Sequence, residues 1–234
     1  MRFIPLLPSS HDPASWPGLR DAELAWTGSL HAGWSALPRR GGGIHAVHLP
    51  VQKLGDRAVE GAVEALRLAG ALNPDFLVLP VPRPEGRKEA FAFLGTVESL
   101  LEALHPRGLK LALRPGPGAE AELARLMKES RGEAVGYCWH EGVGDLEAIS
   151  DRLFCAVGSA GADLAPLQRL GYRWNLALEA ADASGFAAMA LDLEARFPAV
   201  VFPAEMPQEV MGRPVVPDPL VTFGRPSDAR GEKP

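Results

Sequence analysis

The chain has 234 residues, 47% of them hydrophobic, and a net charge of −5. This length supports one sizeable core and is too short for two large domains. A mildly acidic chain without a Lys/Arg run has no overall field that attracts nucleic acid or an anionic membrane, so we expect neither as a partner.

The cysteines and the apolar runs indicate a cytoplasmic protein. Cys138 and Cys155 lie in apolar segments without C-x-x-C spacing, which favours free thiols in a reducing compartment. The N-terminal segment lacks the pattern of a secretory signal. Apolar runs end after roughly eight residues, whereas a membrane helix needs roughly 20.

Short apolar runs alternate with helical patterns along the chain. The runs predict strands at 2–7, 22–26, 44–50, 75–81, 109–115, 134–140, 152–158 and 174–180, with a ninth at 199–205. The helical patterns run from Asp56 to Gly70 and over 88–105, 119–130, 144–150, 163–170 and 185–196, the last capped by Asp182. Residues 8–43 leave little room for a full helix around the second strand.

This alternation predicts parallel βαβ units. Eight of them in this length favour a single compact (β/α)₈ TIM barrel over residues 1–205, followed by a Pro-rich C-terminal extension over 206–234. An open, doubly wound sheet is the alternative, because the strand count is eight or nine.

Four predicted strands end in a polar residue two positions after a small one. His48 follows Ala46, Arg114 follows Ala112, His140 follows Cys138, and Glu179 follows Ala177. Residues two apart share one face of a strand. If these faces point inward, the four side chains converge at the C-terminal mouth of the barrel, where enzymes of this fold build their active sites.

The order of the motifs resembles the xylose isomerase-like barrels, a superfamily of sugar and sugar-phosphate isomerases, epimerases and the endonuclease IV group. "IHAVHLP" resembles a family strand ending in His-x-Pro, and "RGLKLALRPGPG" resembles a strand that normally ends in Glu-Pro. "LQRLGYRWNLALEA" resembles a Leu-Gly-Tyr turn before a strand ending in Glu. The resemblance spans about residues 40–195.

The resemblance implies a divalent metal held by two Glu, one Asp and one His, and this chain departs from that set. Glu179 matches the last Glu, Arg114 stands at the first Glu position, and the Asp position falls on Trp139 or His140. Hard divalent cations need several oxygen ligands, and a guanidinium is a fixed positive charge. We therefore expect no metal and no other cofactor.

Each candidate residue has a functional and a structural interpretation. Glu179 and His140 are candidate catalytic residues, as general base and proton relay, but Glu179 could instead pair with Arg114 and His140 could be hydrogen-bonded without chemistry. Arg114, His48, Glu141 and Trp139 are candidate substrate-binding residues. The alternatives are a surface role for Glu141 and packing against the helices for Trp139.

Two functions remain open. The first is a divergent barrel without the usual metal site, which binds a small anionic sugar-type metabolite and need not be catalytic. The second is a sugar or sugar-phosphate isomerase or epimerase, with Glu179 as base and Arg114 as electrostatic stabiliser of the enediolate. An endonuclease is disfavoured by the missing carboxylates and the acidic charge. The sequence leaves open whether the chain catalyses a reaction and whether it forms a homo-oligomer.

Overall fold

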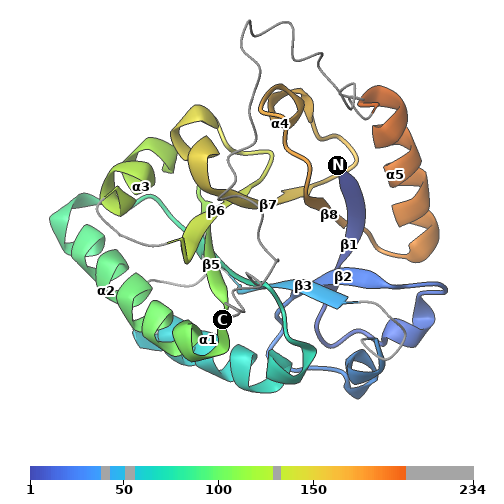
Figure 1. The fold of residues 1–234 in the computed structure, drawn as a ribbon, viewed down its shortest axis with the longest axis horizontal. Helices are drawn as coiled ribbons and strands as arrows, with labels where there is room; N and C mark the ends of the chain where they lie inside the picture. The colour runs from blue at the N-terminus through green and yellow to red at the C-terminus, as the bar shows by residue number, and fades with distance from the viewer. Residues whose placement is uncertain (38–42, 51–55, 129–132, 199–234) are drawn as a thin grey trace, which may run out of the picture. The chain divides into compact units, whose positions relative to one another are not determined.

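The computed structural model describes residues 1–37, 43–50, 56–128 and 133–198. Within them, parallel strands close into a barrel in chain order, from β1 to β8 and back to β1 (Figure 1). The strands are β1 (Arg2–Pro8), β2 (Asp21–Ala25), β3 (Gly43–His48), β4 (Phe76–Val81), β5 (Lys110–Pro115), β6 (Val135–Trp139), β7 (Leu153–Gly158) and β8 (Asn175–Glu179). The predicted (β/α)₈ barrel is confirmed, and the open sheet is excluded because β1 pairs with both β2 and β8.

The helices surround the strands (Figure 1). They are α1 (Asp56–Ala69), α2 (Gly86–Leu104), α3 (Glu120–Met127), α4 (Ala165–Arg169) and α5 (Ala183–Arg196). The short 3₁₀ helices are η1 (Pro13–Ser15), η2 (Ala32–Ala36), η4 (Gly70–Leu72), η5 (His105–Arg107) and η6 (Glu147–Arg152).

Some connections between strands differ from the helices that the sequence predicts. The helix predicted over 144–150 is instead the 3₁₀ helix η6. Pro166 lies in the first turn of α4, where no backbone N–H is needed for the helix, so it does not interrupt it. Residues 8–37 contain only the two short helices η1 and η2, as the limited room there predicts.

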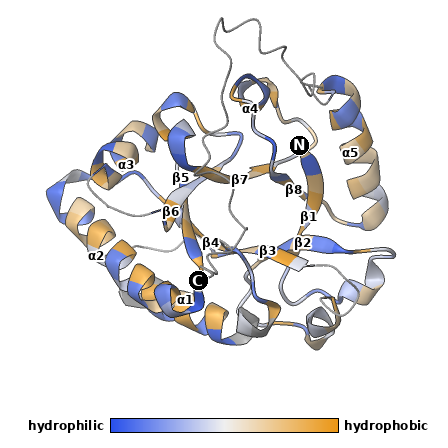
Figure 2. Cartoon of the chain, viewed as in Figure 1, coloured by the Kyte–Doolittle hydropathy of each residue, from blue (hydrophilic) through white to orange (hydrophobic). Residues whose placement is uncertain are grey.

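Two apolar layers build the molecule. Inside the barrel, the cluster contains Ile4, Leu6, Ala46, Val78, Ala112, Cys138, Cys155, Val157 and Ala177. Between strands and helices lie larger side chains such as Trp34, Phe93, Leu111 and Leu123. Figure 2 shows the matching pattern along α2, where hydrophobic and hydrophilic residues alternate on one ribbon.

Part of the sequence prediction lies outside the described residues. The predicted ninth strand at 199–205, the end of the barrel domain at 205 and the Pro-rich extension over 206–234 all belong to this part. Among the helices that the structure describes, none has the length and apolar character to cross a membrane.

Candidate functional site

The barrel presents a polar series at the C-terminal ends of its strands. Ala46, Ala112, Cys138 and Ala177 belong to one cluster inside the barrel, as the alternation predicts. The polar residues two positions further on are therefore in the inward-facing series. A pocket of about 430 Å³ at this end is lined by Arg114 and His140, together with Pro80, Val81, Pro82, Arg83, Pro115, Gly116 and Pro117.

The Pro-Gly-Pro-Gly turn after β5 fixes the position of Arg114. The N–H of Gly116 donates to the carbonyl of Val81 at 2.7 Å, so the turn is tied to the end of β4. A side chain at Gly116 would meet that same carbonyl oxygen at 3.3 Å. Gly118 has a φ of +71°, which glycine adopts without strain. The turn thus closes directly beside the strand end that carries Arg114.

Arg114 is half-buried and lines the pocket. Among the described residues, no hydrogen bond or ion pair engages its guanidinium, whereas Arg83 in the same pocket approaches Glu122 at 3.8 Å. The alternative in which Arg114 pairs with Glu179 has no ion pair among the described residues to support it. Arg114 stands on β5 and Glu179 on β8, and no ion pair joins them.

Both ring nitrogens of His140 are engaged. The Nε2–H donates to the carbonyl of Pro115 at 2.5 Å, and Nδ1 accepts from the N–H of Gly142 at 3.1 Å. Burial lowers the pKa of His140 most, and the charge of Arg114 lowers it further, against the opposing effect of the Pro115 carbonyl. His140 is thus a neutral side chain that joins two loops, and its nitrogens have no capacity left for a substrate.

His48 has a partner that the sequence did not reveal. Its Nε2–H donates to Glu23 Oε2 at 2.5 Å, and the side chains are 5% and 1% exposed. His48 Nδ1 is buried without a hydrogen-bond partner among the described residues. Glu23 lies on β2 and is buried. Its signal was a single carboxylate within the apolar run "AELAW".

The remaining candidates are not among the residues that line the Arg114 pocket. Glu179 is exposed at the end of β8. Glu141 accepts a hydrogen bond from the N–H of Ser159, so it links the loop after β6 to the loop after β7. Trp139 is buried in a cluster with Leu164, Leu167 and Tyr172, on the helix side of β6. These contacts favour the alternative in which Trp139 packs against the helices over contact with a ligand.

The side chains of this mouth do not fit a divalent cation. Arg114 adds positive charge, His140 has no free nitrogen, and Glu179 would be a single carboxylate ligand. Within the described ranges, no group of three or more His, Cys, Asp or Glu side chains is arranged to hold a metal ion.

Several solved structures share this barrel fold. A xylose isomerase domain protein from Planctomyces limnophilus superposes with a TM-score of 0.62 at 12% identity, covering 83% of this chain and 94% of that one. A D-tagatose 3-epimerase-like protein superposes with a TM-score of 0.64 at 15% identity, covering 83% of this chain and 96% of that one. The IOLI protein, solved with a bound zinc atom, superposes with a TM-score of 0.60 at 10% identity, covering 82% of this chain and 97% of that one.

These likenesses establish the xylose isomerase-like TIM-barrel fold that the sequence motifs indicated. No family model matches the chain. No curated protein matches it either. At identities of 10–15% the likeness concerns the fold, and function has to be argued from the site.

Proposed function

We propose that the chain binds a small anionic sugar-type metabolite at the C-terminal mouth of the barrel, without a divalent metal. The observation that carries this proposal is Arg114, a half-buried cation that lines a pocket of about 430 Å³ and has no acidic partner among the described residues. A charge removed from water needs a counter-charge, and a guanidinium fork suits a phosphate or a carboxylate.

The neighbours support the sugar character of the ligand. They include a xylose isomerase domain protein and a D-tagatose 3-epimerase-like protein. The pocket walls include Pro80, Pro82, Pro115 and Pro117, whose rings fix the backbone φ angle, and such preorganisation reduces the entropic cost of binding.

Isomerase chemistry has less support. A proton relay through His140 conflicts with the engagement of both its nitrogens, and Glu179 does not line the pocket of Arg114. We therefore favour binding over turnover, and any turnover would need a base other than His140.

The test is isothermal titration with ribulose 5-phosphate and, as the uncharged probe, ribulose. We expect the phosphate to bind and the neutral sugar to bind at least about tenfold more weakly, because the charge-assisted hydrogen bonds are lost. Arg114→Ala should weaken phosphate binding about 10- to 100-fold. Arg169→Ala, which removes an exposed arginine on α4, is the matched control and should have no effect.

Equal affinity for the charged and uncharged sugars would contradict the proposal. So would phosphate binding that survives Arg114→Ala, since the anion would then be held elsewhere. Steady conversion of either probe to an isomer would show that the site is catalytic and would favour the second function.

A further inference from the structure

A second pocket lies at the opposite end of the barrel. Its lining includes the first residues of four strands: Phe76 of β4, Lys110 of β5, Leu153 of β7 and Asn175 of β8. Its volume is about 500 Å³, within the range of small-molecule sites. Active sites of this fold use the C-terminal face, so this N-terminal pocket is distinct from that of Arg114.

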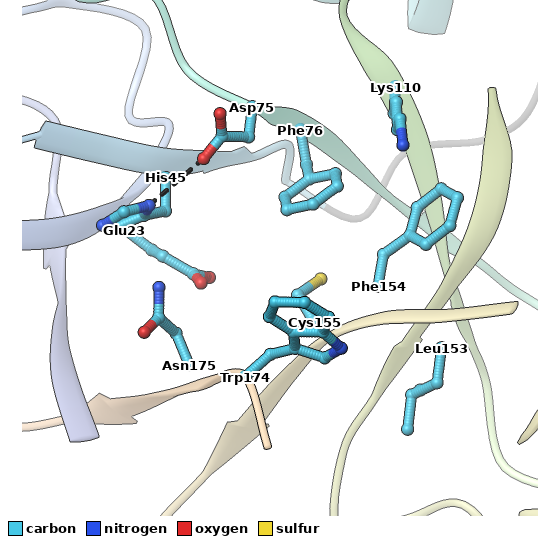
Figure 3. A pocket seen from close by; sticks show the side chains of 10 residues that line it. All are labelled: Glu23, His45, Asp75, Phe76, Lys110, Leu153, Phe154, Cys155, Trp174 and Asn175. Atoms are coloured by element: carbon cyan, nitrogen blue, oxygen red, sulfur yellow. Dashed lines mark hydrogen bonds and ion pairs between the residues drawn. The ribbon is translucent and has the colours of Figure 1, made fainter. Parts of the chain in front are cut away.

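Aromatic rings form the walls of this N-terminal pocket (Figure 3). Phe76 and Phe154 are stacked, with centroids 5.5 Å apart and planes at 26°. Lys110 Nζ lies 5.3 Å from the Phe154 centroid, so its charge is directed at the ring. Trp174 is 68% exposed, although Trp16, Trp26, Trp34 and Trp139 are all buried. An exposed indole at the edge of an aromatic pocket is suited to contact a flat ligand.

The polar end of the pocket is Glu23. Figure 3 shows its carboxylate directed toward the middle of the pocket, with Cys155 and Asn175 nearby. Glu23 is 1% exposed, and only Oε2 is engaged, by His48. Its other oxygen accepts no hydrogen bond from the described residues. A carboxylate oxygen that lines a pocket and accepts no hydrogen bond favours a ligand that supplies a donor.

The rim of the pocket is fixed by a separate set of charges. His45 contacts Asp21 through Nε2 at 3.1 Å and Asp75 through Nδ1 at 3.2 Å. The two contacts hold the His45 ring between two carboxylates, and Glu23, Asn175 and Lys110 are further polar groups of the lining. The pocket therefore combines aromatic walls with a carboxylate acceptor, Glu23, that is engaged on one oxygen only.

We infer that this pocket binds a planar aromatic small molecule of about bicyclic size, which stacks between Trp174 and the phenylalanine pair and donates an N–H to Glu23. Stacking uses the ring faces that the walls offer, and the N–H fills the vacant acceptor. This inference is independent of anion binding at Arg114.

The test compares indole with 1-methylindole, which keeps the ring and lacks the N–H. Isothermal titration on the full chain should show indole binding about tenfold or more tightly than 1-methylindole, because only indole can donate to Glu23. Trp174→Ala should weaken indole binding about 3- to 10-fold through lost stacking, and its exposed position makes the variant safe for folding.

Two control variants separate this N-terminal pocket from other sites. Phe91→Ala removes an exposed aromatic residue of α2 that does not line the pocket, and Arg114→Ala alters the other end of the barrel. Both should leave indole affinity unchanged. The inference fails if indole does not bind, if 1-methylindole binds equally well, if Trp174→Ala has no effect, or if Arg114→Ala abolishes binding.

Discussion

At the scale of single residues, His140 and the pair of Glu23 with His48 show how polar groups are accommodated in this barrel. His140 is held neutral between two loops, and its lowered pKa reflects burial and the nearby Arg114 charge. Glu23 and His48 are buried and satisfy each other on one side only. Both arrangements predict how substitution changes the stability of the folded chain.

His140 should make the stability of the barrel depend on pH. Since its folded pKa lies below the ordinary value of 6.5, the unfolded chain binds the proton more readily. Its full contribution to stability is thus present above about pH 6.5 and is lost as the pH falls through the folded pKa. Thermal melts from pH 5 to 8 should show a smaller slope in His140→Asn, which keeps an acceptor for Gly142. Identical slopes would mean that other groups set the dependence.

Removing one partner of the buried Glu23–His48 pair should strongly lower the stability of the chain. Glu23→Ala removes a buried partner and leaves the imidazole unpaired, so we expect a loss of about 3–5 kcal/mol in the free energy of unfolding. The double variant Glu23→Leu with His48→Leu removes both polar groups and should lie much closer to the native chain. Urea titration measures both. A double variant at least as unstable as Glu23→Ala would contradict this expectation.

At the scale of elements, the start of α5 shows how one side chain sets a helix boundary. Asp182 accepts from the N–H of Gly185 and from the hydroxyl of Ser184, each at 2.7 Å. These bonds, the first above all, lower the pKa of Asp182 below 3.8. The sequence predicted this cap, and α5 begins at Ala183, two residues earlier than the pattern suggested.

Asp182→Ala should lower Tm by about 2–4 °C near neutral pH, because the first turn loses its cap. The depressed pKa means that the contribution is present above about pH 3.8 and is lost as the pH falls through the folded value. Asp182→Asn keeps an accepting oxygen and is the matched control, with little change at any pH. Differential scanning calorimetry would contradict the assignment if Ala and Asn behaved alike.

At the scale of the whole molecule, the fold could be predicted and the partners of its polar residues could not. Small residues at 46, 112, 138 and 177 indicated which strand faces line the barrel, because alternation is a local property. The contact of His48 with Glu23 depends on the pairing of β2 with β3, whose register shifts between Ala22 and Leu24. Such a shift has no local signature, so this contact could not be predicted from the sequence.

The last prediction concerns metal, because the neighbours include a zinc-bound barrel and the mouth of this one carries Arg114. Dialysis against EDTA should leave Tm unchanged, and adding Mn²⁺ or Zn²⁺ should not raise it. A resident site at one hundred times its Kd would contribute about 2.7 kcal/mol, or about 5–10 °C for a chain of this size.

Arg114→Glu provides the matched variant. It places a carboxylate at the position where the strand motif that this chain resembles ends in Glu-Pro. This variant should respond to Mn²⁺ more than the native chain, because the fixed positive charge is replaced by an oxygen ligand. Elemental analysis of the purified native protein completes the test. Stoichiometric metal, or a fall in Tm on chelation, would show that other residues complete a cation site and that Arg114 does not displace it.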